Sequence, residues 1–374
     1  MQTSTPLARP ARDTRLDILR GWMQISIFLS HLTGSVFAWG IHAAWGLSDS
    51  SEQFMLLSGL TLGSVFTLKA SREGYWGAQR DLLLRAWKLY GTQLRLFLGF
   101  ALMVLVVALA RGGDGDLLQR GGWCLLVDAP LTALLGMLTL LYQPEYMGIL
   151  PGFVVGMLLL GPFLWLVHRL GAWALVPSVL VYAAAQLGWL ATPGLSDEGI
   201  AFDPLAWQLL YVLGGLMGRC ALLGQALPWP RLLRWGAVAV VVLGFAARLV
   251  EHGFLPGPAL AVAALQHKEI LAPTRLLHAL ALAYLVATLL PREAGWMQGR
   301  VMQALALVGR HSLPVFCLGL FLAWGVNTAT RDLPQHALLL DVALAPLGVA
   351  LLWARARWAE GGWLRATIFR VRTA

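Results

Sequence analysis

Long apolar stretches recur along almost the whole chain, and they constrain the fold more than any other feature. A helix that crosses a bilayer needs about 20 mostly apolar residues, and a helix bonds all its backbone polar groups internally. Ten stretches approximately meet this length: 16–37, 51–68, 92–110, 147–167, 172–190, 204–224, 232–250, 273–290, 305–325 and 337–354. The run Pro130–Tyr142 is shorter and predicts an interfacial or re-entrant helix; if it spans the membrane, the count becomes eleven.

The composition supports the same class. Hydrophobic residues make up 58% and charged residues 13% of the chain, with a mean hydropathy of +0.68, whereas soluble domains carry about 25% charged residues. We predict an all-α polytopic membrane protein of about ten transmembrane helices. It forms one integral-membrane domain over residues 1–374, with the transmembrane bundle in 16–354. Residues 1–15 lack the pattern of a cleavable signal peptide, so we expect the first apolar segment to remain in the protein.

The distribution of basic residues predicts the orientation. If the chain has ten spans and a cytoplasmic N-terminus, 19 of the 28 basic residues fall in cytoplasmic segments and four in segments outside the membrane. This bias follows the positive-inside rule and predicts that both termini, including a basic tail at 355–374, are cytoplasmic. It also accounts for most of the net charge of +9, so no nucleic-acid partner is expected.

The metal-binding residue types show no recognisable spacing. The three cysteines form no CxxC pair, and the eight histidines form no HExxH pattern. We expect no metal site and no disulfide framework.

The first apolar segment carries an arginine and a histidine on one face. Arg20 and His31 are eleven residues apart, which is 20° past three helical turns and about 16.5 Å along the axis. An arginine near the bilayer core costs roughly 2.5 kcal/mol unless it faces protein or water, so the pair is a candidate functional site. The alternative is that Arg20 reaches the interface and His31 bonds a neighbouring helix. Thr14 and Asp17 fit a helix-start pattern, and Asp17 can equally neutralise Arg20.

The second segment opens at the predicted outer face with acidic residues. Asp49 or Ser50 can cap the helix, and Glu52 lies one turn further in. If the first two helices are antiparallel neighbours, Glu52 lies at about the same depth in the membrane as His31. Its carboxylate can then orient the imidazole ring, which a general base requires. A carboxylate that serves only its own helix start is an equal alternative.

Two further groups of polar residues border later segments. Lys268, Arg275 and His278 gather near the outer face, where they can hold an anionic or sugar-rich substrate. Arg310 and His311 precede Pro314, which can kink the ninth segment. Together with Arg20 they predict a positive cluster on the inner side that suits phosphate groups. Surface snorkelling of Lys268 and structural packing at the kink are the alternatives.

The order and spacing of these residues resemble a known family. The Arg20-x10-His31 pattern resembles the acyltransferase-3 type of membrane O-acyltransferases. The segments that carry a closer resemblance, to the OpgC branch, are 15–21, 48–59, 142–151, 203–210, 273–278 and 309–317. This resemblance covers about residues 12–330, and the part after 330 matches weakly.

The resemblance implies an enzyme of the bacterial inner membrane that succinylates osmoregulated periplasmic glucans. Succinyl-coenzyme A is the implied co-substrate, with no bound cofactor, and the partners are acyl-coenzyme A, the glucan and membrane lipid. His31 is then the catalytic histidine and Arg20 the arginine of the family motif. From the positions of the residues themselves we expect Glu52 and Arg20 in the catalytic group with His31. We expect donor contacts from Arg20, Arg310 and His311, and acceptor contacts from Asp49, Lys268, Arg275 and His278. The alternatives are an O-acyltransferase for another exported polysaccharide, and a transporter or flippase, which commonly carries repeated halves that this sequence lacks.

Overall fold

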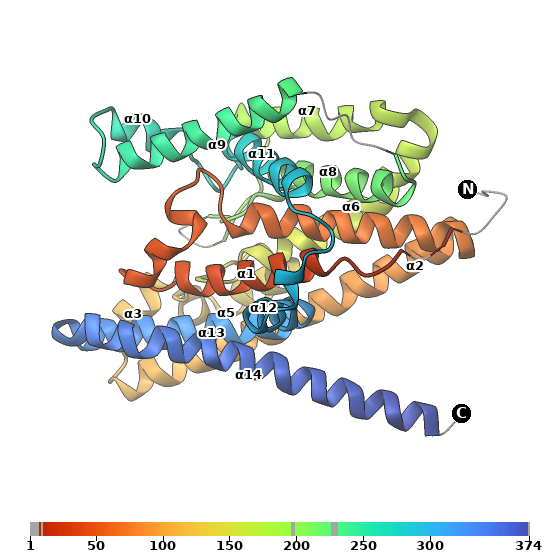
Figure 1. The fold of residues 1–374 in the computed structure, drawn as a ribbon. Coiled ribbons are helices and arrows are strands. Elements are labelled where there is room, and N and C mark those ends of the chain that lie inside the picture. The colour runs from red at the N-terminus through yellow and green to blue at the C-terminus, as the bar shows by residue number, and fades with distance from the viewer. Residues whose placement is uncertain (1–6, 9, 196–198, 226–230, 373–374) are drawn as a thin grey trace. The chain divides into compact units, whose positions relative to one another are not determined.

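The chain is mostly helical in the part that the structure describes. The structure is a computed structural model, and it describes residues 7–8, 10–195, 199–225 and 231–372. Strands are absent from these residues, which confirms the predicted all-α class (Figure 1). The helices are α1 (Thr14–Ser30), α2 (Ser50–Ala110), α3 (Gly115–Arg120), α4 (Leu125–Asp128), α5 (Pro130–Thr139), α6 (Ile149–Leu170), α7 (Leu175–Gln186), α8 (Pro204–Leu222), α9 (Arg231–Glu251), α10 (Ala259–Ala264), α11 (Pro273–Leu289), α12 (Arg300–Arg310), α13 (Ser312–Asp332) and α14 (Ala337–Arg372). Short 3₁₀ turns lie between some of them: η1 (Val36–Gly40), η2 (His42–Ala44), η3 (Gly171–Ala174), η4 (Gly295–Gln298) and η5 (Pro334–His336).

The helices group into two compact units. The first unit consists of Met1–Pro10, Met55–Trp229 and Ala263–Leu276. The second consists of Ala11–Phe54, Pro230–Val262 and Leu277–Ala374. The prediction of a single domain is not tested by this division, because α2 and α11 each run through a boundary between the units.

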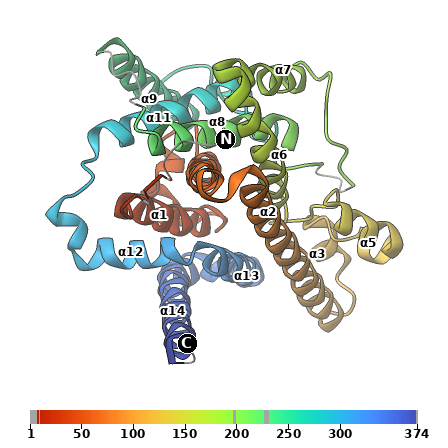
Figure 2. The ribbon, with the colours of Figure 1, turned by 90° about the vertical axis from the view of Figure 1, so that its right-hand side faces the viewer.

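The second unit is built on α1 and the last three helices. Helix α1 packs against α12 and α13, and α14 packs against α13 and α12; Figure 2 shows α1 alongside α12. The buried core of this packing contains Phe28, Leu32, Val308 and Val315, together with small residues such as Ala345. Because Phe28 and Leu32 flank His31 in the sequence, the core anchors the end of α1 that carries the histidine.

Two glycines bring α1 and α12 into backbone contact. A Cβ atom added at Gly21 would lie 1.9 Å from the carbonyl oxygen of Leu305, and one added at Gly309 would lie 1.9 Å from that of Asp17. No other residue type fits at this distance, and small residues are what allow membrane helices to approach closely. The contact brings together the helices that carry Arg20 and Arg310.

The first unit uses the same device between α2 and α8. Gly59 and Gly63 face the backbone of Tyr211 and Gly215, and Gly214 and Gly218 face the backbone of Leu56 and Leu60. Each helix therefore contributes a pair of glycines four residues apart, the spacing that places both on one helical face.

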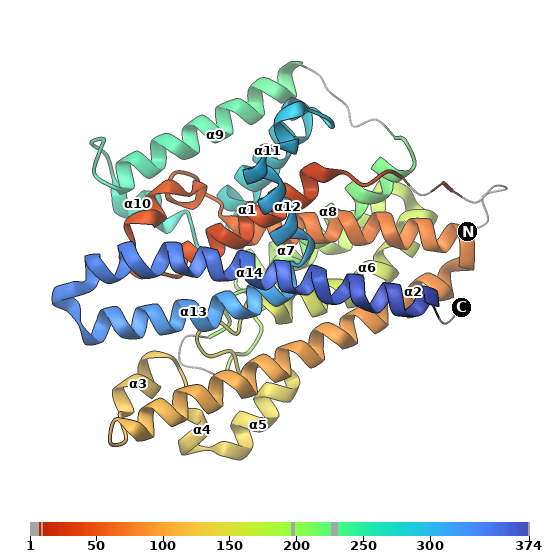
Figure 3. The same ribbon diagram turned by 60° about the horizontal axis from the view of Figure 1, so that its bottom comes forward.

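Helix α2 reverses its direction at Gly74. This residue has φ 76° and ψ 173°, which is outside the helical region, and the two arms of α2 fold back on each other (Figure 3). Lys69 on the first arm contacts Asp81 on the second at 3.2 Å, so an ion pair also joins the arms. The predicted spans 51–68 and 92–110 lie on different arms. The basic stretch 78–90 is continuous with the rest of the second arm.

Six helical segments of the described residues are long and apolar enough to cross a membrane: Ser50–Ala110, Ile149–Gln186, Pro204–Leu222, Arg231–Glu251, Ser312–Asp332 and Pro334–Gly361. Two of these contain two predicted spans each. The apolar helix Pro273–Leu289 and helix α1 have 17 residues each, one residue short of the 18-residue minimum length used for the six segments. The run from Pro130 forms the short helix Pro130–Thr139, as predicted. Membrane character is thus supported, whereas the count of ten and the location of the termini stay predictions.

Candidate functional site

His31 ends α1 and has a defined ring orientation. Its Nδ1 lies 2.6 Å from the carbonyl oxygen of Ile27. A carbonyl oxygen only accepts hydrogen bonds, so Nδ1 carries the proton, and in the neutral ring the lone pair resides on Nε2. The ring is therefore in the tautomer that a general base or a nucleophile requires at Nε2.

Asn327 of α13 holds the backbone around this histidine. Its Nδ2 donates to the carbonyl oxygen of His31 at 2.7 Å, and its Oδ1 accepts from the backbone N–H of Thr33 at 2.9 Å. The side chain is 8% exposed. One amide thus joins both peptide groups that flank Leu32 to the neighbouring helix. Asn327 is not among the predicted site residues. The signal for it in the sequence is that it is the only asparagine of the chain and lies near an apolar span.

Glu52 and Asp49 form a reciprocal cap at the start of α2. Glu52 is fully buried, and its Oε2 accepts from the backbone N–H of Asp49 at 2.9 Å. Asp49 in turn accepts from the backbone N–H of Ser51 at 2.7 Å. This is the capping-box arrangement, which satisfies donors that a helix start leaves unpaired. The capping alternative for Glu52 is therefore observed, and its orientation of His31 stays a prediction.

The start of α1 differs from the prediction. Asp13, not Thr14, is the N-cap, because its Oδ1 accepts from the backbone N–H of Arg15 at 3.1 Å. Asp17 pairs with Arg12 through two bonds, at 2.6 and 3.2 Å. This hydrogen bond to Asp17 raises the pKa of the Arg12 guanidinium. The predicted cap is wrong because the cap lies one residue earlier. Asp17 interacts electrostatically with Arg20, as expected, and also pairs with Arg12.

The predicted inner positive cluster contains a carboxylate that the sequence analysis missed. Helix α12 ends at Arg310, and His311 breaks the helix before α13 begins at Ser312. Glu360 of α14 bonds the Nε2 atom of His311 and lies 3.4 Å from Nη2 of Arg310. Arg20 is half-buried on α1, and the contact at Gly21 and Gly309 joins α1 to the helix that Arg310 ends. The second unit therefore brings these three cationic positions onto adjoining helices and adds a counter-charge.

His278 is a buried residue of the second unit. It is 3% exposed, and its Nδ1 lies 2.7 Å from the hydroxyl oxygen of Ser48 and accepts from the backbone N–H of Ser48 at 3.3 Å. Gly46 and Gly244 are close to the ring, since a Cβ on either would lie within 3.0 Å of it. His278 thus holds the loop that leads into α2. Its contact with an acceptor stays a prediction.

The other two predicted acceptor residues belong to the first unit. Arg275 is 7% exposed in the first turn of α11. The Lys268 ammonium lies 5.2 Å from the ring centroid of Phe202, a cation–π distance. The predicted grouping of Lys268 and Arg275 with His278 stays a prediction, because His278 belongs to the second unit.

Comparison with known families adds the decisive observation. The family model described as OpgC protein matches residues 12–364. The chain belongs to the OpgC protein family. The match continues past residue 330, where the resemblance in sequence was weak, so it includes Asp341 and Glu360. The link to the acyltransferase-3 type stays a prediction.

Membership in the OpgC family implies a transferase-type enzyme. The apolar helices support its description as a membrane protein. No curated protein and no solved structure matches this OpgC-family chain.

Proposed function

We propose that this protein is an inner-membrane O-acyltransferase that transfers succinyl groups from succinyl-coenzyme A to glucose hydroxyls of osmoregulated periplasmic glucans. Membership in the OpgC family supports the reaction class. The observation that carries the proposal for the site is the ring of His31, whose Nδ1 is held by the carbonyl of Ile27.

His31 acts as the general base in this proposal. Nε2 accepts the proton of a glucose hydroxyl, whose oxygen attacks the thioester carbonyl carbon. The new C–O bond forms, the C–S bond breaks, and the coenzyme A thiolate leaves and takes the proton from the imidazolium. If the reaction passes through an acyl-histidine, the same nitrogen is the nucleophile. A radiolabelled succinyl donor would then label His31 when glucan is omitted.

The donor enters from the cytoplasmic side in this proposal. Arg20, Arg310 and His311 bind its phosphates, since guanidinium groups match phosphate oxygens in geometry and charge. Glu360, which bonds both Arg310 and His311, keeps them oriented before the donor arrives. The acceptor arrives from the outer side, where Asp49, Lys268, Arg275 and His278 are the proposed contacts.

The test is mass spectrometry of periplasmic glucans from cells that lack the gene. The glucans should lose the succinyl mass increment, and the wild-type gene should restore it, whereas His31→Ala should not. His336→Ala is the matched control, because His336 is exposed and should restore succinylation fully.

Each contrary result identifies a different error. Restoration by His31→Ala at the wild-type level would disprove the role of the histidine and leave the substrate assignment intact. Glucans that never differ in mass would disprove the glucan assignment and favour a transporter or another polysaccharide.

A further inference from the structure

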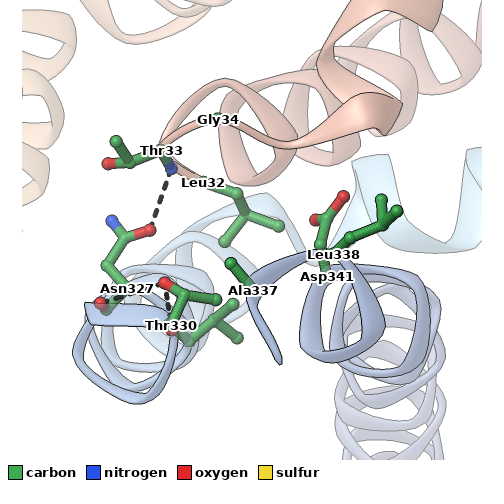
Figure 4. Close-up of a pocket in the computed structure, with 9 residues that line it drawn as sticks. Leu32, Thr33, Gly34, Asn327, Thr330, Ala337, Leu338 and Asp341 are labelled. Atoms are coloured by element: carbon green, nitrogen blue, oxygen red, sulfur yellow. Dashed lines mark hydrogen bonds between the residues drawn. The ribbon is translucent and has the colours of Figure 1, made fainter. Parts of the chain in front are cut away.

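A cavity lies within the second unit beside the loop that follows His31. Its volume is about 170 Å³, it is partly open, and it is lined by Thr33 and Gly34, by α13, and by the start of α14. Figure 4 shows Asn327 and Thr330 on α13 and Asp341 on α14 around the same space. A cavity of about 150 Å³ holds a benzene-sized molecule, so this one accommodates a single six-membered ring.

Asp341 gives the cavity a buried acceptor. The residue is 6% exposed, and its Oδ2 accepts from the backbone N–H of Val36 at 2.9 Å. Its Oδ1 is buried and has no hydrogen-bond partner among the residues that the structure describes. A buried polar atom without a partner carries a desolvation cost of about 1–3 kcal/mol, and more when it is charged. Asp341 lines the cavity, so a hydrogen-bond donor that enters the cavity and reaches Oδ1 would remove that cost.

The other residues that line the cavity offer both polar and apolar surface, and a sugar ring has both kinds. Thr330 donates its hydroxyl proton to the carbonyl oxygens of Val326 and Asn327 at 3.0 and 3.1 Å, which leaves its oxygen to accept. Leu32, Val326 and Ala337 supply apolar surface. A sugar ring has hydroxyls around its edge and C–H groups on its faces, so it can satisfy both kinds of wall.

The position and charge of the cavity favour binding of the glucan acceptor over the succinyl donor. Thr33 is two residues after His31, and Asn327 bonds the backbone of both. The cavity and the histidine are therefore held by the same side chain. A succinyl group ends in a carboxylate, and a buried Asp341 carboxylate at this site would repel it. A neutral hydroxyl of a glucan has no such penalty.

We propose that this cavity is an acceptor subsite, which binds one glucose residue of the glucan with Asp341 accepting from its hydroxyls. The inference rests on the proposed function, because it takes the acceptor to be a glucan. It adds a site that neither the sequence pattern nor the family assignment identifies.

The experiment measures initial rates of the purified full-length protein with succinyl-coenzyme A and unsubstituted glucan isolated from cells that lack the gene. Asp341→Asn should raise the KM for glucan about tenfold or more, because hydrogen bonds to a charged acceptor are the strong ones. The KM for the donor should stay within about twofold. The matched control is Asp332→Asn, the same change at an exposed carboxylate that ends α13, which should leave both constants unchanged.

A second variant covers the case in which Asp341→Asn does not fold. Ala337→Leu keeps the carboxylate but fills part of the cavity, and it should raise the KM for glucan by a similar factor. Binding of radiolabelled glucan without donor should weaken in parallel in both variants.

The outcomes separate the two proposals. If the wild type transfers succinyl and both variants keep the wild-type KM for glucan, the subsite is wrong and the function stands. If the wild type binds glucan in an Asp341-dependent way but transfers no succinyl, the function is wrong and the subsite stands. A melting temperature that rises with Na⁺ or Ca²⁺ only when Asp341 is present, without any effect of glucan, would identify a cation site and overturn the inference.

Discussion

At the scale of single residues, the site depends on how the backbone around His31 is held. The Nδ1 bond to Ile27 is local, within four residues, and any helix end with a histidine can form it. The bonds from Asn327 are not local, since they join residues almost 300 positions apart in the chain. Asn327 is therefore a positioning residue, which acts on the reaction through the placement of His31.

Replacement of Asn327 by alanine should reduce turnover more than stability. Both bonds to the loop are lost, each contributing about 0.5–1.5 kcal/mol. A shift of the histidine of about 1 Å can lower kcat about 100-fold. We expect a fall in kcat of about 10- to 100-fold, measured as the initial rate of succinyl transfer at saturating donor and glucan.

Two further variants distinguish positioning from a general structural role. Asn327→Asp keeps the acceptor for the Thr33 N–H but loses the donor to His31, so its kcat should be intermediate. Thr328→Ala, at the neighbouring half-buried position, should behave as wild type. A lower kcat measured well below the melting temperature of each variant would support the positioning role, whereas an unchanged kcat in Asn327→Ala would contradict it.

At the scale of elements, glycines decide which helices meet. Gly21 and Gly309 allow α1 and α12 to touch through their backbones, and the paired glycines of α2 and α8 do the same in the first unit. Gly74 has the different task of reversing α2, because φ 76° is a left-handed conformation that side chains with a Cβ rarely adopt.

Replacement of Gly21 by alanine should separate α1 from α12. The added Cβ would lie 1.9 Å from the Leu305 carbonyl oxygen, so the backbones must move apart. Overpacking of this kind costs about 1–3 kcal/mol, and the melting temperature of the purified protein should fall. The control is Gly325→Ala in α13, where an added Cβ meets nothing within 4 Å. The close contact would be disproved if Gly21→Ala melted no lower than this control.

Replacement of Gly74 by alanine should destabilise the reversal of α2. The combination of φ 76° and ψ 173° is essentially restricted to glycine and costs an L residue about 1–3 kcal/mol, which should appear as a lower melting temperature. Gly91→Ala on the second arm is the matched control, since the nearest atom to its Cβ would be 4.0 Å away. Its alanine should be neutral or slightly stabilising, because glycine is a poor helix former. Equal melting of the two variants would argue against the bend.

At the scale of the whole molecule, the helices indicate which segments can span the membrane, and the basic residues indicate how those segments are oriented. The helices show which segments are long and apolar enough to span, and in the described part of the chain six are. The distribution of basic residues predicts which ends face the cytoplasm. The ten-span prediction places residues 8 and 293 inside and residues 114 and 335 outside.

Labelling of single cysteines with a membrane-impermeant maleimide tests this orientation. Cys124, Cys220 and Cys317 are first replaced, and a cysteine is then introduced at one of the four positions. In intact spheroplasts, Asp114→Cys and Gln335→Cys should be labelled, while Ala8→Cys and Glu293→Cys should react only after lysis. Labelling of Ala8→Cys before lysis would contradict a cytoplasmic N-terminus, and protection of Gln335→Cys would contradict the ten-span count.

The sequence by itself determined the helical class and the short helix from Pro130, offered Asp49 as one of two possible caps of α2, and selected His31, Arg20 and Arg310 as candidates. These features follow from local causes: the length of an apolar run, the residues of a helix start, and the cost of an ionisable group within an apolar segment. The order of the motifs was also enough to indicate the OpgC family, which the match over residues 12–364 confirmed.

Only the tertiary structure decided which distant side chains join these residues. Asn327 on His31, Glu360 on His311 and the cavity at Asp341 each bring α1 or α12 together with residues of α13 or α14. The apolar pattern does not reveal which helices are neighbours, because a surface that faces lipid and a surface that faces another helix are both apolar. The neighbours are instead chosen by close packing at glycines and by the need of each buried polar group for a partner.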